Sequence, residues 1–201
     1  MAGRRVTVAG LLAEIEKDVV FFDDSGGGVT LSGGEPLAQP EFAAALLAAC
    51  RERRIHTVIE TCGFVPLGTL LEAALATDAV LFDLKLVDAA KHRLHTGAPN
   101  AAILRNLAEL AARHPAVSVR IPVVPGINDS EADVHQFAQY LAGIQTPVEL
   151  LPYHHTGAAK YARLGRTYRL DATRQPAAAD LARFADALAR AGLTVTIGDA
   201  Q

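Results

Sequence analysis

The sequence predicts an α/β protein in which parallel strands are joined by crossover helices, arranged as a barrel or as an open sheet. Two observations lead to this fold class. Segments typical of strands and of helices take turns along the whole chain. The strand segments, such as "DAVLFDLK" at 78–85, are nearly all apolar, which is typical of parallel strands covered by helices on both faces.

The elements of the N-terminal half follow from their local patterns. A helix at 7–22 begins at Thr7 and carries apolar residues at helical spacing. The segments that follow are a strand at 28–33, a helix at 40–54 with Pro40 as its first residue, a strand at 55–61, a helix at 67–77 and a strand at 78–85.

The C-terminal half continues the alternation. Ser130 precedes two acidic residues and an apolar pattern, which predicts a capped helix start. The expected elements are a helix at 100–114, a strand at 116–126, a helix at 130–144, a strand at 147–154, a helix at 176–192 that ends at Gly192, and a strand at 193–198.

Composition limits the class of protein. The 201 residues are enough for one domain, 1–201, and 50% of them are apolar, which favours a folded core. The net charge of −3 gives no general attraction for nucleic acid or an anionic membrane. No apolar run reaches the ~18 residues of a membrane span. We therefore expect a cytoplasmic protein without nucleic-acid or membrane partners.

Polar residues and glycines gather where the predicted strands end. The carboxyl ends of parallel strands share one edge of a barrel or sheet, where active sites form. Each residue also has an ordinary interpretation: Asp83 with Lys85 as a structural ion pair, or His154 as a satisfied surface histidine. Five successive strands with this feature favour a functional edge. The residues are Gly33, Gly34 and Glu35, Glu60 and Thr61, Asp83 and Lys85, Arg120, and His154 and His155.

The charges at this edge have both signs, and a zwitterionic ligand fits them. An ammonium group can meet glycine carbonyls and a carboxylate, while a carboxylate can meet Lys, Arg or His. Glycine allows a close approach of the backbone to a ligand. The sequence contains neither G-x-G-x-x-G nor G-x-x-x-x-G-K-[ST], so nothing indicates a dinucleotide or a P-loop nucleotide.

A long loop at 156–176 carries five basic residues, Lys160, Arg163, Arg166, Arg169 and Arg174. Such a loop can serve as a lid or as a surface for a partner. An ordinary solvated loop has the same composition, so both interpretations stay open.

Six motifs in order resemble the radical S-adenosylmethionine (SAM) enzymes that activate glycyl radical enzymes, of the pyruvate formate-lyase activating enzyme type. They are "VTLSGGEPL", "IETCGF", "FDLKLVD", "HTGAPNAAILRNL", "RIPVVPGIND" and "LLPYHHTGAAKYARLGRTY". The resemblance runs from about residue 5 to the end. It implies a partial, open TIM-type barrel, SAM as cofactor, and a glycyl radical enzyme as protein partner.

The resemblance also implies roles for the residues at the strand ends. Gly33, Gly34 and Glu35 would bind the amino group of SAM. Lys85, Arg120 and His154 would lie near its methionine carboxylate and sulfonium, with Lys85 and His154 the expected catalytic residues. Asp83 would contribute to cofactor binding and, with Glu60 and Thr61, to a site for a monovalent cation. Some relatives have aspartate where this chain has Glu60.

The family reaction also needs a [4Fe–4S] cluster held by a Cys-x-x-x-Cys-x-x-Cys loop, and an electron from it cleaves SAM to a radical. This sequence has two cysteines, Cys50 and Cys62, which are expected to be reduced thiols, and neither matches the loop. The resemblance therefore implies that the first barrel strand and the cluster ligands are missing from residues 1–201. We expect the chain to bind little iron and to be inactive alone.

Two other functions remain open at this point. The chain could be a non-catalytic module that binds a SAM-like ligand or docks on a glycyl radical enzyme. It could also be a metal-independent enzyme that uses Lys85 to form a Schiff base. The nearby Asp83 argues against the second, because a neighbouring carboxylate raises the pKa of a lysine.

Overall fold

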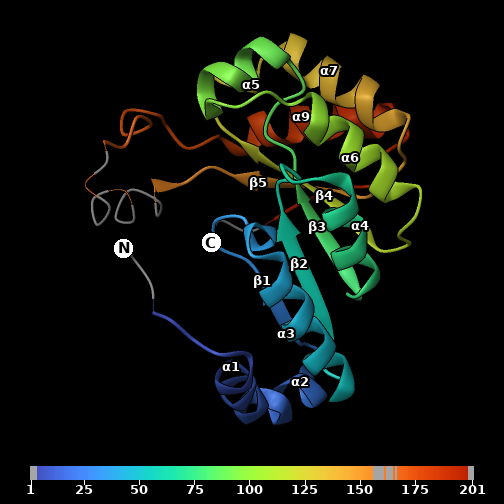
Figure 1. Cartoon of the computed structure of the whole chain (residues 1–201). Coiled ribbons are helices and arrows are strands. Elements are labelled where there is room, and N and C mark those ends of the chain that lie inside the picture. Colours follow the sequence, from blue (N-terminus) through green and yellow to red (C-terminus); the bar gives the residue numbers. More distant parts are fainter. Residues whose placement is uncertain (1–3, 156–160, 162–164, 166, 199–201) are drawn as a thin grey trace. The chain divides into compact units, whose positions relative to one another are not determined.

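The computed structural model describes the chain except residues 1–3, 156–160, 162–164, 166 and 199–201. In the described part, six strands alternate with helices, and hydrogen-bonded neighbours follow the order β1-β2-β3-β4-β5-β6 (Figure 1). β1, β2 and β3 pair in parallel, as do β4, β5 and β6. This confirms the expected α/β fold with parallel strands in an open, partial barrel arrangement.

The chain groups into two compact units, which are described separately. The β1–β3 unit comprises Arg5–Asp83 and Ala101–Ser118. The β4–β6 unit comprises Met1–Arg4, Leu84–Asn100 and Val119–Gln201. The single domain over residues 1–201 that the sequence predicts stays a prediction.

The β1–β3 unit begins with a helix whose start the sequence predicts correctly, because the Thr7 hydroxyl accepts the Gly10 N–H at 3.1 Å. The predicted helix at 7–22 is interrupted by a 3₁₀ turn. The elements of this unit are α1 (Val8–Ile15), η1 (Glu16–Asp18), α2 (Val19–Ser25), β1 (Val29–Leu31), η2 (Pro36–Ala38), α3 (Pro40–Glu52), β2 (Thr57–Thr61), α4 (Leu67–Leu75), β3 (Ala79–Asp83) and α6 (Ala101–Ala111).

Helices cover one face of this unit's strands. α3 packs against β2 and α4, and α4 packs against α6 (Figure 1). The core between them contains fully buried Leu47, Ile59, Phe82 and Leu107. Burial of such side chains stabilises the fold by about 1.5–3 kcal/mol each.

The register of β2 decides which side chains share a face. Glu60 pairs with Leu81, and Thr61 pairs with Phe82. Side chains alternate along β2: Thr57, Ile59 and Thr61 are buried, whereas Val58 and Glu60 are partly exposed. Successive residues of a strand point to opposite faces, so Glu60 and Thr61 do not point the same way.

The start of β2 is tied to the start of β3 by Asp78. Its carboxylate accepts the Thr57 N–H at 2.7 Å and the Thr57 hydroxyl at 3.1 Å. The backbone hydrogen bond from Thr57 lowers the pKa of Asp78, because it favours the ionised carboxylate.

The β4–β6 unit contains a helix that the sequence analysis missed. Asp88 accepts the Lys91 N–H at 2.7 Å and caps this helix, and Gly97 ends it in the left-handed conformation at φ 81°. Its apolar pattern is weak, since His92 is its one buried residue. The elements are α5 (Ala89–Thr96), β4 (Val117–Val123), α7 (Glu131–Ala142), β5 (Val148–Pro152), α9 (Ala178–Arg190) and β6 (Val195–Ile197).

The predicted cap at Ser130 is confirmed, because its hydroxyl accepts the Asp133 N–H at the start of α7. α7 and α9 lie side by side, and Phe137 and Phe184 meet between them with ring centroids 5.6 Å apart. No helix among the described residues has both the length and the apolar character needed to cross a membrane.

Candidate functional site

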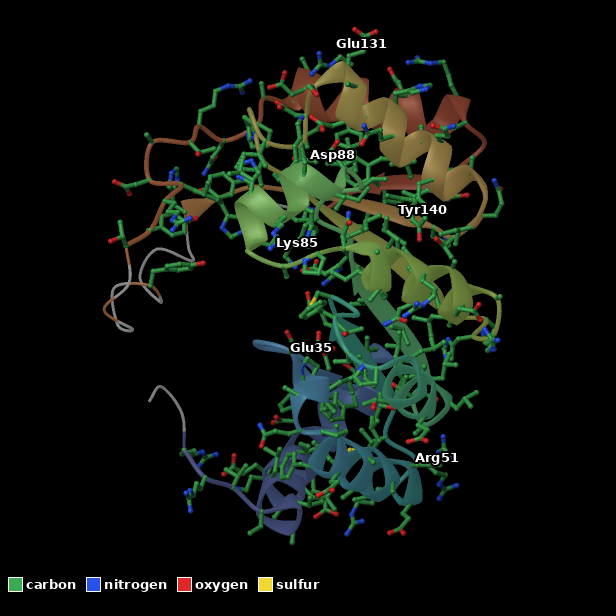
Figure 2. The ribbon with its side chains drawn as sticks, turned by 45° about the horizontal axis from the view of Figure 1, so that its top comes forward. Glu35, Arg51, Lys85, Asp88, Glu131 and Tyr140 are labelled. Atoms are coloured by element: carbon green, nitrogen blue, oxygen red, sulfur yellow. The ribbon has the colours of Figure 1, made fainter. Side chains whose placement is uncertain are left out.

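Glu35 joins the end of β1 to the end of β2. Its Oε1 accepts the Leu37 N–H at 3.1 Å, and its Oε2 accepts the Cys62 N–H at the same distance. The Thr61 hydroxyl lies 2.9 Å from both oxygens. Figure 2 shows Glu35 at the end of the unit where the strands finish, whereas Arg51, on α3, lies toward the other end. Glu35 is therefore a fixed anchor for the loop that carries the two glycines.

Gly33 and Gly34 turn the chain between β1 and this anchor. Their φ angles are 86° and 65°, in the left-handed region that favours glycine. A Cβ at either position would meet no described atom within 4 Å. A hollow of about 340 Å³ beside β1 includes Ser32, Gly33 and Glu35 in its lining. The backbone conformation therefore favours glycine at both positions, and open space lies where a Cβ would stand.

The three residues expected at a cation site are only partly brought together. Glu60 accepts a hydrogen bond from the Ser32 hydroxyl at 2.6 Å. Asp83 lies two residues after Leu81, the register partner of Glu60, so Glu60 and Asp83 share one face of the sheet. The Thr61 side chain lies on the other face, is 2% exposed, and contacts Glu35.

The cation site stays a prediction. Thr61 donates its proton to Glu35, and its oxygen accepts the Gly63 N–H at 3.0 Å, so the hydroxyl already serves the anchor. In the described part of the chain, no three His, Cys, Asp or Glu side chains gather closely enough to hold a metal ion.

The loop after β2 is held by residues that the sequence analysis did not single out. Asn106, on α6, donates to the carbonyls of Gly63 and Val65 at 2.9 and 2.8 Å. Gly63 packs so closely on Phe82 that a Cβ there would lie 2.3 Å from the ring. The sequence marks this contact by the Cys-Gly pair after the predicted strand and by an asparagine on the apolar face of a helix. Neither signal indicates that the asparagine binds the loop after β2.

In the β4–β6 unit, Arg120 pairs with a carboxylate that the sequence analysis also missed. Arg120 and Glu149 are register partners on β4 and β5, and the Arg120 Nε donates to Glu149 Oε2 at 2.7 Å. The two side chains are 21% and 29% exposed. The charge of Arg120 is therefore largely balanced within the sheet.

Lys85 and His154 both follow strand ends. Lys85 is half-buried just after β3, and its carbonyl accepts the Asn128 side-chain N–H at 3.0 Å. His154 is half-buried two residues after β5, next to Tyr153, whose N–H donates to Val123 of β4 at 3.2 Å. Strand geometry thus places both residues where the sequence predicts them.

Two of the five basic residues of the long loop at 156–176 lie in the part of the chain that the structure describes. Arg169 and Arg174 are exposed, and Arg174 pairs with Asp180 at 2.8 Å. The side-chain hydrogen bond from Arg174 lowers the pKa of Asp180. The other basic residues of the predicted lid, Lys160, Arg163 and Arg166, lie outside the described residues.

Each unit thus carries part of the predicted edge. The β1–β3 unit contributes Gly33, Gly34, Glu35, Glu60, Thr61 and Asp83, and the β4–β6 unit contributes Lys85, Arg120 and His154. The convergence of the two groups on one ligand stays a prediction.

Comparisons with known proteins identify the family. The model of the Radical SAM superfamily matches residues 2–138. The chain is 42% identical to the choline trimethylamine-lyase activating enzyme of Oleidesulfovibrio alaskensis, covering 91% of this chain and 61% of that protein. It is 39% identical to the pyruvate formate-lyase 2-activating enzyme of Escherichia coli, with 98% and 68% covered.

A solved structure agrees with these relatives. A domain of pyruvate-formate lyase-activating enzyme from Bacteroides vulgatus matches with a TM-score of 0.72 and 30% identity, over 86% of this chain and 99% of that domain. The chain spans 54–61% of the length of the first curated relatives it matches. It belongs to the radical SAM superfamily and, within it, to the activating enzymes of glycyl radical enzymes.

Proposed function

We propose that residues 1–201 form the SAM-binding core of an enzyme that generates a glycyl radical on a partner enzyme by reductive cleavage of SAM. The observation that carries this proposal is the anchored glycine turn. Gly33 and Gly34 have positive φ angles and open space where a Cβ would lie, and Glu35, the next residue, is held by Thr61 and Cys62. Such a turn suits the amino end of a zwitterion.

Glu35 would act on the cofactor mainly through the turn that it holds. Its carboxylate already accepts hydrogen bonds from Leu37, Thr61 and Cys62, which leaves limited capacity for a ligand ammonium. The carbonyls of Gly33 and Gly34 would accept the ammonium protons, and the negative charge of Glu35 would favour them at short range.

The methionine carboxylate of SAM would meet hydrogen-bond donors of the β4–β6 unit. Lys85 and His154 would donate to it. Arg120 would contribute less than the sequence analysis expects, because its guanidinium is already paired with Glu149.

The residues of this chain do not fit the [4Fe–4S] cluster of the family. Cys50 lies within α3 with no exposed surface, and burial raises the pKa of its thiol, which disfavours a thiolate ligand. Cys62 follows β2, and its thiol lies 3.3 Å from Glu35. Because a cluster needs several thiolates at one place, Cys50 and Cys62 do not form a site for it.

The test is calorimetry of SAM binding to chain 1–201 with two matched variants. Gly34→Ala introduces a Cβ at a φ of 65°, where an alanine is strained, and places it at the proposed ammonium site. Gly26→Ala introduces the same strain at a φ of 67° after α2, again with no described atom within 4 Å of the new Cβ.

We expect Gly34→Ala to weaken SAM binding at least about tenfold, which corresponds to about 1.4 kcal/mol. Gly26→Ala should keep wild-type affinity. Equal affinities for all three proteins, or no heat of SAM binding by the wild type, would contradict the proposal.

A non-catalytic module that binds SAM or docks on a glycyl radical enzyme is the second candidate, and the cysteine positions favour it. Residues 1–201 alone are expected to leave SAM intact under either candidate, so the two differ in whether a protein that contains these residues together with a cluster-binding loop can receive an electron. An activating enzyme reconstituted with iron and sulfide under reducing conditions releases 5′-deoxyadenosine from SAM, whereas a binding module leaves SAM intact.

A further inference from the structure

The stretch that leads from β3 to α5 carries Lys85 on a backbone that several hydrogen bonds hold in place. Leu84 N–H donates to the Arg120 carbonyl of β4 at 2.9 Å. The side chain of Asn100 donates to the carbonyls of Leu86 and Val87 at 3.2 and 2.8 Å. The peptide between these two attachments, that of Lys85, is bonded by Asn128.

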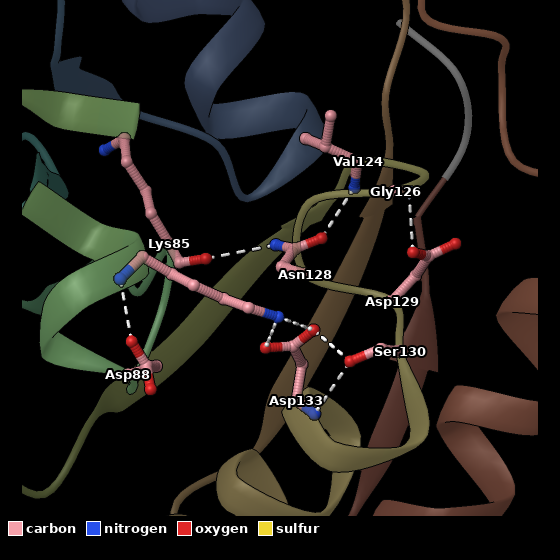
Figure 3. A network of polar contacts seen from close by, with 9 residues as sticks. Lys85, Asp88, Val124, Gly126, Asn128, Asp129, Ser130 and Asp133 are labelled. Carbon is pink, nitrogen blue, oxygen red and sulfur yellow. Dashed lines mark hydrogen bonds and ion pairs between the residues drawn. The ribbon is translucent and has the colours of Figure 1, made fainter. Parts of the chain in front are cut away.

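Asn128 makes this attachment through its side-chain amide, and Figure 3 shows its bonds to the Lys85 carbonyl and to the Val124 N–H. Its Nδ2 donates to the carbonyl of Lys85 at 3.0 Å and to that of Pro122 at 2.7 Å. Its Oδ1 accepts the Val124 N–H at 2.8 Å. Because Asn128 is 1% exposed, water cannot readily replace these bonds.

The turn that presents Asn128 is fixed without help from Lys85. Asp129 accepts the Gly126 N–H at 2.7 Å, and Gly126 has a φ of 79°. Ser130 then caps α7 through the Asp133 N–H. Asn128 therefore connects a rigid turn after β4 to the backbone of Lys85.

We propose that Asn128 is a positioning residue for Lys85 in SAM binding. The inference rests on the proposed function, in which Lys85 meets the methionine carboxylate. A fixed Lys85 peptide fixes the direction of its Cα–Cβ bond, so less conformational entropy is lost when the side chain binds its ligand. Substitution of Asn128 keeps the ammonium group of Lys85 but removes the hydrogen bond that holds the Lys85 backbone and orients its side chain.

A control substitution is available in the same unit, at a side-chain contact that also joins two elements. Lys91 Nζ lies 2.7 Å from both carboxylate oxygens of Asp133, which is 3% exposed, and this pair ties α5 to α7. Lys91→Met breaks that tie and leaves the Asn128–Lys85 bond in place. It separates a general loss of stability from a loss of Lys85 positioning.

The first experiment is a double-mutant cycle on chain 1–201, with SAM affinity measured by calorimetry and folding checked by urea unfolding. Asn128→Ala should weaken binding about tenfold in the wild-type background and less than about twofold in the Lys85→Met background. Lys91→Met should lower stability and leave affinity unchanged. Equal losses from Asn128→Ala in both backgrounds would overturn the inference.

The second experiment measures the acetylation rate of Lys85 in the absence of SAM. It therefore tests the inference even if the wild type does not bind SAM and the proposed function is wrong. Lys85 is acetylated with acetic anhydride, and the modified peptide is quantified by mass spectrometry relative to exposed Lys17. Asn128→Ala should change the relative rate at least about threefold, as expected for a displaced backbone, and Lys91→Met should not. An unchanged rate in Asn128→Ala would overturn the inference.

A second variant covers the case in which Asn128→Ala does not fold. Asn128→Asp keeps the shape and the acceptor for Val124, but replaces the group that donates to Lys85 and Pro122. The same change in affinity and labelling is expected from it, and wild-type values in both assays would contradict the proposal.

Discussion

Replacing Thr61 by valine removes a hydroxyl group that makes the shortest contacts to Glu35, 2.9 Å to each carboxylate oxygen. The same oxygen accepts the Gly63 N–H at 3.0 Å. Valine has nearly the shape of threonine, so the substitution tests the polar contacts without creating a cavity. Thr61 is 2% exposed, so water has little access to the groups left behind.

The expected cost follows from the two contacts. A hydrogen bond to a charged group contributes about 1.5–3 kcal/mol, and a buried N–H left unpaired costs about 1–3 kcal/mol. The two losses share one atom and do not add fully, so we expect Thr61→Val to lower the free energy of unfolding by about 3 kcal/mol. With an m-value of about 3 kcal/mol/M, the urea midpoint falls by about 1 M.

The assay is urea unfolding followed by circular dichroism, with two control variants. Thr61→Ser keeps the hydroxyl and should recover most of the loss. Thr30→Val makes the same substitution at an exposed position of β1 and should change stability by less than about 0.5 kcal/mol. A Thr61→Val protein as stable as Thr30→Val would refute the anchoring role of Glu35 and Thr61.

Three further predictions concern acid stability, the ion pair and iron. The pKa of Asp78 is lowered in the folded state, so its ionised carboxylate adds to the free energy of unfolding at neutral pH, and this contribution is lost as pH falls below about 4. The urea midpoint of Asp78→Asn should therefore fall less between neutral and acid pH than the midpoint of the wild type. Glu149→Gln leaves Arg120 with a neutral partner and should lower the free energy of unfolding by about 1–3 kcal/mol. The double variant Glu149→Gln/Arg120→Met should recover part of this stability, as measured by thermal unfolding. Anaerobic reconstitution of chain 1–201 should give less than about one iron per chain in a colorimetric assay, and a brown protein with about four irons would contradict the cysteine argument.

Most elements of the fold could be predicted from the sequence, because their signals are local. The caps at Thr7 and Ser130 lie within three residues of the groups they bond, and Pro40 marks the start of α3. Alternation of apolar strands and helices predicts the parallel sheet. α5 was not predicted because its sequence lacks a clear apolar face, since it buries one side chain, that of His92.

The residues at the strand ends could be predicted, but their partners could not. Glu35 and Thr61 are 26 residues apart, and Arg120 and Glu149 are 29 apart. These pairs depend on strand register, which one sequence does not determine. The family resemblance groups Thr61 with Glu60 in a cation site, whereas the alternation of side chains along β2 directs Thr61 to the other face, where it contacts Glu35.

The most direct test of the proposed SAM site is a crystal structure of chain 1–201 with SAM bound. The methionine ammonium should lie within hydrogen-bond distance, about 2.7–3.2 Å, of the Gly33 or Gly34 carbonyl, and Lys85 or His154 should reach the carboxylate. A SAM molecule bound away from the glycine turn, or Lys85 and His154 directed away from Gly34, would contradict it.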